Sequence, residues 1–554
     1  MKNNQLTPWQ RFIGLLSLEK REILQIFYYG VFGGIVALSL PLGIQAIINL
    51  IQGAQISTSW IVLVIIVTVG VIFSGALQLM QLRIIETIQQ RIFTRASFEL
   101  SYRFPKIKMT ELRNYYPPEL ANRFFDTLTI QKGLSKILID VPTAFLQIIF
   151  ALILLSFYHP FFIIFGILLL LLIFIVFKFT AKKGLETSLI ESKIKYKVAH
   201  WIQEVARTVV SFKLSGNTNF ALKKNDDLVN KYLEARENHF KILIIQFIQM
   251  IGFKVIVTAS LLLIGGALVL NQEMNIGQFV AAEIIILLVI ASVEKLIIGL
   301  ESLYDVLTSI EKIGQVVDKE LENQNGEKQI FREGIDIELD EVSYGVENKE
   351  KHIIKNVSLK LNPKSRILIM GESGAGKSTL LRLIAGINQP TAGHIYINNL
   401  SLKSLHLNHY RSQLGISLSD ETPFEGSIRE NLVFGNKEIK DDVIYEALEI
   451  VGLTQFLKEQ ANGLGTVLYP EGKQMSYTIV KKIILARAII KQPKVMILED
   501  PLDQFNLEET LKIINYLTSS ERTWSLIVVS SKKSWRTQCN QTITLEKGEI
   551  KSIK

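Results

Sequence analysis

The chain has 554 residues, 48% of them hydrophobic, and a formal net charge of +9. This length predicts more than one domain, and the apolar residues are concentrated in roughly the first 300 positions. The Lys and Arg residues of that half flank apolar stretches, so membrane topology explains the charge better than a surface for nucleic acid. We therefore expect no nucleic-acid partner. The single cysteine, Cys539, excludes an internal disulfide.

The first long apolar run is expected to cross a membrane twice. Residues 23–82 contain no Asp, Glu, Lys or Arg, and one crossing helix needs about 20 apolar residues. A polar break at Gln52–Ser59 predicts helices near 23–50 and 60–82. Residues 1–20 show no cleavable signal peptide, so the first span is expected to act as the targeting signal.

Two further helix pairs follow the same pattern. The predicted spans lie at 139–158, 161–178, 242–270 and 276–300. His159-Pro160 divides one pair and Asn271–Asn275 the other. Charges inside the last pair leave two readings open: Glu283 lines a polar pathway or sits near the outer interface. Lys254 either extends its amine to the membrane surface or lies in a cytoplasmic extension of its helix.

Loop charges predict the orientation of these spans. The three short turns contain no Lys or Arg, whereas the connections 83–138 and 179–240 are rich in both. Positive residues favour the cytoplasmic side of a membrane. We therefore expect a multi-pass protein of the cell (inner) membrane with both termini in the cytoplasm. The long connections are predicted to continue the helices into the cytoplasm. Small crossing helices are expected at Pro117–Asp126 and His200–Thr208.

From about Gly334 the pattern becomes that of an α/β domain, with short β-rich runs alternating with helices. The apolar run Ile367–Met370 leads into a G-x-x-x-x-G-K-S loop and then an amphipathic helix. A chance glycine turn is the alternative, but this strand–loop–helix context favours phosphate binding. Lys377 is expected to reach the β- and γ-phosphates and Ser378 to ligate Mg²⁺. The predicted phosphate-binding residues are Gly371, Glu372, Ser373, Gly374, Ala375, Gly376, Lys377, Ser378 and Thr379.

With six spans, two crossing segments and this loop, the chain resembles the ABC exporter family over nearly its full length. Supporting segments are Thr391–Asn399, Pro423–Gly435, Ile484–Ala488, Lys494–Leu498 and Thr544–Ile550. Gly277-Gln278 is similar to haemolysin-type (type I secretion) and peptide-exporting members. The resemblance implies an all-α six-helix transmembrane domain followed by an α/β P-loop NTPase domain, with ATP and Mg²⁺ as ligands. The expected parts are residues 1–20 (cytoplasmic segment), 21–315 (transmembrane domain), 316–334 (linker) and 335–554 (nucleotide-binding domain).

The acidic pair after the Walker B strand departs from the family. The family has Asp-Glu, in which the Asp holds Mg²⁺ through water and the Glu polarises the attacking water. This chain has Glu499-Asp500. Glu499 remains a candidate for the metal shell, and Asp500, one methylene shorter than the usual base, is a weak candidate for that role. A displacement of about 1 Å in such a site can cost on the order of a hundredfold in rate.

The family's Leu-Ser-Gly-Gly-Gln signature aligns with residues 475–479, where only Ser476 is kept and Tyr477 and Thr478 replace both glycines. Other family positions also differ. The Q-loop Gln corresponds to Ser419, the switch His to Ser531, the D-loop to Asp503–Asn506, and the adenine-stacking aromatic to Val346, with Tyr344 nearby.

The resemblance implies a subunit of an ATP-binding exporter in a bacterial cell membrane, in contact with membrane lipid. We expect an ABC-type ATPase that binds ATP with weak or absent hydrolysis, working as a homodimer or as a heterodimer with a related half-transporter. Its substrate is expected to be a peptide or protein, or otherwise a lipid or hydrophobic small molecule. A periplasmic adaptor and an outer-membrane channel are candidate partners. The alternative is a non-transporting ATP-binding scaffold or regulator of a secretion complex, while a soluble P-loop enzyme has no need of six spans.

Overall fold

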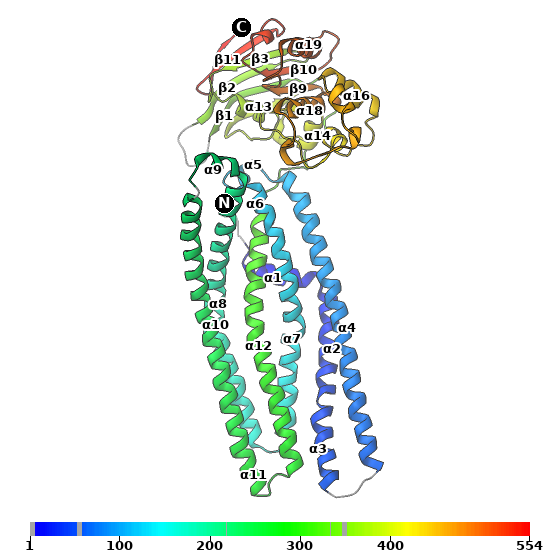
Figure 1. The fold of residues 1–554 in the computed structure, drawn as a ribbon, viewed down its shortest axis with the longest axis vertical. Coiled ribbons are helices and arrows are strands. Elements are labelled where there is room, and N and C mark those ends of the chain that lie inside the picture. Colours follow the sequence, from blue (N-terminus) through cyan, green and yellow to red (C-terminus); the bar gives the residue numbers. More distant parts are fainter. Residues whose placement is uncertain (1–5, 53–57, 218, 333, 346–351) are drawn as a thin grey trace. The chain divides into compact units, whose positions relative to one another are not determined.

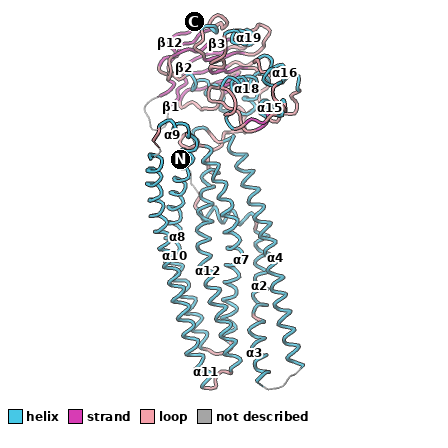
Figure 2. The backbone as a smooth tube through the Cα atoms, viewed as in Figure 1, coloured by secondary structure: helices cyan, strands magenta, loops and turns pink. Residues whose placement is uncertain are grey.

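The computed structural model describes residues 6–52, 58–217, 219–332, 334–345 and 352–554. The chain forms two compact units (Figure 1). The first comprises Met1–Pro105 and Asn114–Lys319, and the second comprises Lys106–Arg113 and Glu320–Lys554. Among the described residues all named strands lie in the second unit, as Figure 2 shows.

The first unit is built from long helices arranged in packed pairs. Its principal helices are α1 (Pro8–Leu18), α2 (Lys20–Ala37), α3 (Ser39–Gln52), α4 (Thr58–Arg103), α7 (Asp126–Ser156), α8 (Phe161–Arg207), α10 (Asn219–Ser260), α11 (Gly266–Leu270) and α12 (Ile276–Val317). A π-helical turn, Leu261–Gly265, joins α10 to α11. Helix α2 packs against α4, α7 against α12, and α8 against α10 (Figure 1).

Five stretches of the described residues are long and apolar enough to cross a membrane. They are Lys20–Gln52, Thr58–Lys106, Pro117–Ser156, Asn219–Leu270 and Ile276–Val317. In α4 only 6% of the most apolar window is buried within the protein, so its apolar side chains require a non-aqueous surround. Helix α8 contributes the shorter apolar stretch Phe161–Leu171 among its described side chains. The predicted all-α transmembrane fold class is confirmed.

The predicted breaks between helices coincide with helix ends where the structure describes them. Helix α7 ends at Ser156 and α8 begins at Phe161, on either side of His159-Pro160. At the start of α12, the Asn275 side chain accepts from Gln278 N at 2.7 Å, and Gln278 Oε1 accepts from Asn275 N at 2.9 Å. This reciprocal cap fixes the beginning of the helix. Of the first break, residues 53–57 lie outside the described residues.

One of the two crossing segments was wrongly placed by the sequence. The first, Pro117–Asp126, begins with the short helix α6 (Pro117–Ala121) and a 3₁₀ turn. His200–Thr208 instead belongs almost entirely to α8, because nothing in that segment interrupts the helical apolar spacing. The short helix that follows is α9 (Val209–Ser215), which ends at Gly216 with φ of 63°. Glycine adopts this left-handed conformation without a steric penalty.

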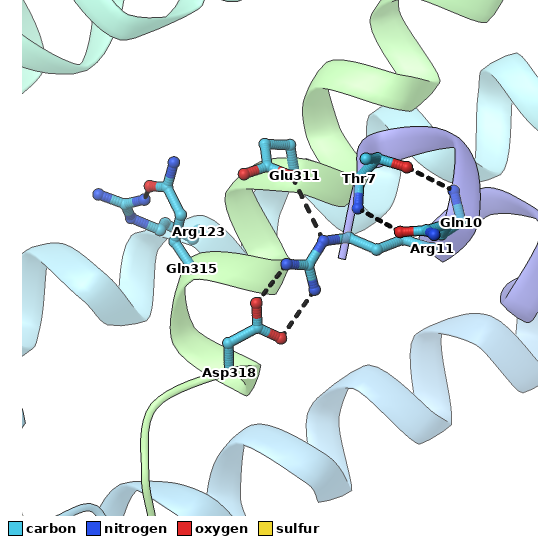
Figure 3. Close-up of polar contacts among 7 residues, drawn as sticks. All are labelled: Thr7, Gln10, Arg11, Arg123, Glu311, Gln315 and Asp318. Carbon is cyan, nitrogen blue, oxygen red and sulfur yellow. Dashed lines mark hydrogen bonds and ion pairs between the residues drawn. The ribbon is translucent and has the colours of Figure 1, made fainter. Parts of the chain in front are cut away.

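A single arginine, Arg11, connects α1 to the C-terminal end of α12. Arg11 of α1 donates from Nη1 to Asp318 Oδ1 at 2.8 Å, and its Nη2 pairs with the other oxygen of that carboxylate (Figure 3). Its Nε also donates to Glu311 Oε2 at 3.3 Å. The two-pronged geometry fixes the direction of α1, because a guanidinium matches a carboxylate in only a few orientations. Elsewhere in this unit, Lys254 and Glu294 form an ion pair of 3.0 Å.

The second unit contains a mixed six-stranded sheet that positions the candidate site. Its strands in order are β12 (Glu549–Ile553), β11 (Gln541–Glu546), β3 (Arg366–Gly371), β10 (Ser525–Val529), β9 (Val495–Glu499) and β6 (Leu414–Ser417). All neighbours are parallel except β11 and β12. The residues of β9 and β10 are all buried, which explains their continuous apolar runs.

An antiparallel four-stranded sheet and a set of helices complete this unit. The sheet is ordered β2 (His352–Leu361), β1 (Ile337–Gly345), β4 (Ala392–Ile397) and β5 (Leu400–Ser401), and the short strands β7 (Gly426–Ser427) and β8 (Val467–Leu468) pair separately. The helices are α5 (Met109–Leu112), α13 (Lys377–Ile384), α14 (Leu407–Ser412), α15 (Ile428–Val433), α16 (Asp441–Ile450), α17 (Thr454–Lys458), α18 (Tyr477–Ile490) and α19 (Leu507–Thr518). The predicted α/β class of this part is confirmed.

Candidate nucleotide-binding site

The glycine-rich loop connects β3 to α13 and has the backbone conformation that a phosphate cradle needs. Gly371, Gly374 and Gly376 have φ values of 152°, 82° and 98°. A Cβ at Gly376 would lie 2.8 Å from Ile354 Cδ1 and 2.9 Å from the carbonyl oxygen of Ile353. Any other residue at this position would therefore be both strained and overcrowded. A Cβ at Gly374 would meet no atom of the described residues within 4 Å, so this part of the loop is open.

Lys377 spans the loop from the first turn of α13. Its Nζ donates to the carbonyl oxygens of Gly371, at 2.7 Å, and Glu372, at 2.8 Å. The first backbone N–H groups of a helix have no acceptor within it, so those of Lys377, Ser378 and Thr379 can bind an anion. These donors and this cation fit the phosphates of a nucleotide, and nucleotide binding by these residues stays a prediction.

Glu499 connects three segments at the carboxyl ends of the parallel strands. Its side chain, only 5% exposed, lies at the end of β9. Ser378 Oγ donates to Oε1 of Glu499, and Ser419 N donates to Oε2 at 3.2 Å. The structure therefore places the predicted metal-shell residues Ser378 and Glu499 in direct contact. A carboxylate beside a hydroxyl is a suitable ligand pair for Mg²⁺, which prefers oxygen.

Asp500, the candidate base, has an unusual backbone and an acidic neighbourhood. Its φ is 41°, and its N–H donates to the Val529 carbonyl at 2.8 Å, which connects the ends of β9 and β10. Burial raises the pKa of the Asp500 carboxyl, Glu499 and Asp503 raise it further, and Lys377 and Lys481 oppose the change. A carboxylate with a raised pKa accepts a proton more readily, which suits a base. Its strained backbone adds a local cost.

Lys481 is a charged residue of this site that the sequence motifs did not indicate. Its side chain is 2% exposed, and Nζ donates to the Ser419 carbonyl at 2.6 Å. Burial lowers the pKa of the Lys481 amine, whereas the carboxylates of Glu421, Asp420, Glu499 and Asp500 raise it. Lys481 thus places a cation close to the Walker B acids. A pair of lysines interrupting an otherwise apolar stretch of α18 was the available signal.

The remaining predicted residues lie at the edges of this arrangement. Ser476 caps α18 by accepting from Ile479 N at 3.4 Å, and it is exposed. Ser531 is exposed just after β10, and the Ser419 side chain is also exposed while its backbone contacts Glu499 and Lys481. Tyr477 of the signature segment is 44% exposed.

Tyr344, a candidate for stacking on adenine, lies in β1 and is largely buried. The Arg113 guanidinium carbon lies 5.4 Å from the centre of its ring, and Arg113 Nη2 donates to its hydroxyl. Adenine stacking on this ring therefore stays a prediction that requires space beside Arg113. Val346, which corresponds to the family's aromatic, is outside the described residues.

The contacts of Glu499 lead to a first prediction. Glu499→Leu removes both accepting oxygens, so the Ser378 hydroxyl and the Ser419 N–H both lose this acceptor. An unsatisfied buried donor costs roughly 1–3 kcal/mol, so the cassette should unfold several degrees lower. Thermal unfolding of the purified full chain checks this, with Glu508→Leu at an exposed position of α19 as the matched control. Equal unfolding temperatures for the two variants would contradict the assignment.

Comparison with known proteins identifies both units. The transmembrane region model of ABC transporters matches residues 23–293, and the ABC transporter model matches residues 354–503. A solved structure of a bacterial Atm1-family ABC exporter with ATP bound superposes with a TM-score of 0.82 at 15% identity. The match covers 97% of this chain and 95% of that one, and shows the shared fold.

Curated relatives match part of the chain. An uncharacterised ABC transporter ATP-binding protein, YfiB of Bacillus subtilis, is 28% identical over 43% of this chain. The leukotoxin export ATP-binding protein LtxB of Aggregatibacter actinomycetemcomitans is 24% identical over 56% of it. The toxin RTX-I translocation ATP-binding protein of Actinobacillus pleuropneumoniae is 27% identical over 55%. The chain spans only 42%, 44% and 43% of the lengths of these three relatives.

The resemblance predicted from the sequence is confirmed by matches that cover both units in the expected order. The chain belongs to the ABC transporter family, as an exporter-type member that joins a transmembrane region to an ATP-binding domain.

Proposed function

We propose that this chain is one half of an exporter that binds Mg-ATP and hydrolyses it slowly or not at all. The observation that carries the proposal is the phosphate loop connected through Ser378 to Glu499. The phosphate loop keeps every residue of its motif, while residues that act on the γ-phosphate in the family are replaced.

Each binding residue has a defined task in this proposal. The glycine loop and the N-terminus of α13 would hold the phosphates. Lys377 would exchange the carbonyls of Gly371 and Glu372 for phosphate oxygens. Ser378 and Glu499 would hold Mg²⁺, whose charge neutralises the phosphates when it is bound. The contacts of Glu499 already hold the start of α13, the end of β9 and the Ser419 segment together before binding.

Slow turnover follows from the residues around these elements. Asp500 carries a shorter side chain than the family's base, and Ser531 stands where the family has a histidine. Tyr477 and Thr478 replace the glycines that allow a backbone to approach the γ-phosphate. In the family each site of a dimer combines the phosphate loop of one cassette with the signature of the other. Because this chain is altered in both, it would slow both sites of any dimer.

A restoration experiment tests the proposal. The restoring changes are Glu499→Asp, Asp500→Glu, Tyr477→Gly, Thr478→Gly and Ser531→His. Combined in one variant, they should raise steady-state ATP turnover at least on the order of tenfold, because they correct the reach of the base and the approach of the backbone. Phosphate release and binding of labelled ATP are measured on both purified proteins.

Lys377→Ala is the control and should abolish ATP binding in either background. If the unmodified chain already turns over ATP rapidly, and as fast as the restored variant, slow hydrolysis is refuted. If the unmodified chain binds no ATP, the whole proposal fails.

We also propose that both termini lie in the cytoplasm, because Lys and Arg are absent from the short turns and frequent in the long connections. In a Cys539→Ser background, Asn271→Cys lies in the turn before α12 and Lys231→Cys lies at an exposed position of α10. A membrane-impermeant maleimide applied to intact cells with a permeable outer envelope should label only Asn271→Cys. Labelling of Lys231→Cys alone would show the opposite orientation and contradict the proposal.

The names of two relatives suggest a substrate class. Those names refer to leukotoxin export and to toxin RTX-I translocation. We propose a peptide or protein substrate, with a periplasmic adaptor and an outer-membrane channel as partners and a dimer as the working form.

The replaced catalytic residues favour a second candidate, an ATP-binding membrane scaffold. Transport into sealed inverted vesicles separates the two, because a scaffold gives no ATP-dependent uptake with any peptide that the purified chain binds.

A further inference from the structure

The helical unit contains a large cavity, lined by several charged side chains, that the ATP-binding proposal leaves unused. Its volume is about 1220 Å³, and it is lined by residues of α6, α8, α10 and the end of α12. Figure 3 shows three of its lining residues, Arg123, Glu311 and Gln315, with Glu311 and Gln315 on α12. The volume is that of a small-molecule site rather than of a single ion.

Positive charge dominates the cavity walls. Its lining cations are Arg123, Lys193, Lys197, Arg207, Lys224 and Lys312. These six face three lining carboxylates, Glu119, Glu204 and Glu311, which leaves an excess of three positive charges with His200 neutral. Two of those carboxylates are already engaged: Glu204 with Arg207 at 2.7 Å and Glu311 with Arg11 at 3.3 Å. Counting the adjacent Asp126 as a fourth carboxylate, the cavity still has an excess of two positive charges.

Two of the cations are buried, which makes their incomplete pairing costly. Arg123 and Lys312 are each 6% exposed. The Nε of Arg123 has no hydrogen-bond partner among the described residues, its Nη1 donates to Gln315, and its Nη2 lies 3.7 Å from Glu119. A buried guanidinium with one unused donor, and with its carboxylate partner near the outer limit of ion-pair distance, favours an additional anion.

Lys312 lies over an aromatic ring. Its Nζ is 5.1 Å from the ring centre of Tyr196, and the Arg123 guanidinium carbon is 5.5 Å from the same centre. The Tyr196 hydroxyl donates to Asp126, a buried carboxylate whose negative charge offsets part of the positive charge of Arg123 and Lys312. Two buried cations thus converge on one ring beside a single buried carboxylate, so one further negative group would balance their charges.

We propose that this cavity binds a small molecule that carries two or more carboxylate or phosphate groups. Arg123 and Lys312 hold one anionic group at the buried end, and the exposed Lys193 and Lys197 meet a second group nearer the opening. Arginine and lysine are the usual partners of such oxyanions. The site lies on the helical unit and does not depend on ATP binding by the cassette.

Citrate, a tricarboxylate, is the probe that tests this site. Titrations use the full chain in detergent, without Mg²⁺, in the Lys377→Ala background, so that the phosphate loop is removed as an alternative anion site. Calorimetry should show saturable citrate binding, while acetate at equal ionic strength should show none. Lys312→Gln and Arg123→Gln should each weaken citrate binding about tenfold or more, in line with the loss of one charged hydrogen bond.

Because Arg123 and Lys312 are buried, their substitution can also disturb folding, so two further variants at exposed positions are tested. Lys193→Gln, at an exposed lining position, should weaken citrate severalfold without disturbing the core. Lys231→Gln, an exposed change on α10 outside the lining, should leave citrate affinity unchanged. The proposal is overturned if acetate binds as well as citrate, if citrate does not bind, or if all four variants bind citrate equally.

Discussion

The carboxylate of Glu499 is the contact on which the arrangement of the cassette site depends. It accepts from the Ser378 hydroxyl at the start of α13 and from the Ser419 backbone N–H after β6. Since the side chain is buried, both bonds act in a medium where an unmet donor is costly. Contacts within the protein thereby hold together the phosphate loop, the end of β9 and the Q-loop position. A site organised in this way is prepared to bind, whatever its rate of chemistry.

Charge in the same region explains how the reversed acid pair is accommodated. Glu499 and Asp500 bring two carboxylates together in a partly buried place, which alone is unfavourable. Lys377 and Lys481 approach them from two sides, on α13 and α18. Lys481 also donates to the Ser419 carbonyl, next to the N–H that binds Glu499. The two lysines thus offset part of the negative charge of the acidic pair within the cassette.

Structural elements could be predicted from the sequence where one continuous stretch of residues carries a strong physical signal. Uncharged runs as long as 23–82 have few alternatives to a membrane, and the glycine pattern of 371–378 fixes a loop that closes around phosphate. The position of the second crossing helix was predicted wrongly because no local signal marks where the long helix ends. The segment 200–208 has helical spacing and no breaker, so α8 runs through it and the short helix follows at 209–215.

Contacts between distant positions could not be predicted from one sequence. Arg11 and Asp318 are 307 positions apart, and nothing near either residue indicates the other. Lys481 was missed for the same reason, because its partners lie in the 418–421 segment and at the end of β9. The cation-lined cavity likewise depends on α6, α8 and α12 meeting in space.

The most direct measurement for the central claim is an electron cryomicroscopy structure of the full chain in lipid nanodiscs with Mg²⁺ and ATP. The account predicts nucleotide on the 371–378 loop, Lys377 moved from the carbonyls of Gly371 and Glu372 to the phosphates, and a metal ion beside Ser378 and Glu499. A loop without nucleotide at saturating ATP, with Lys377 still on those carbonyls, would contradict it.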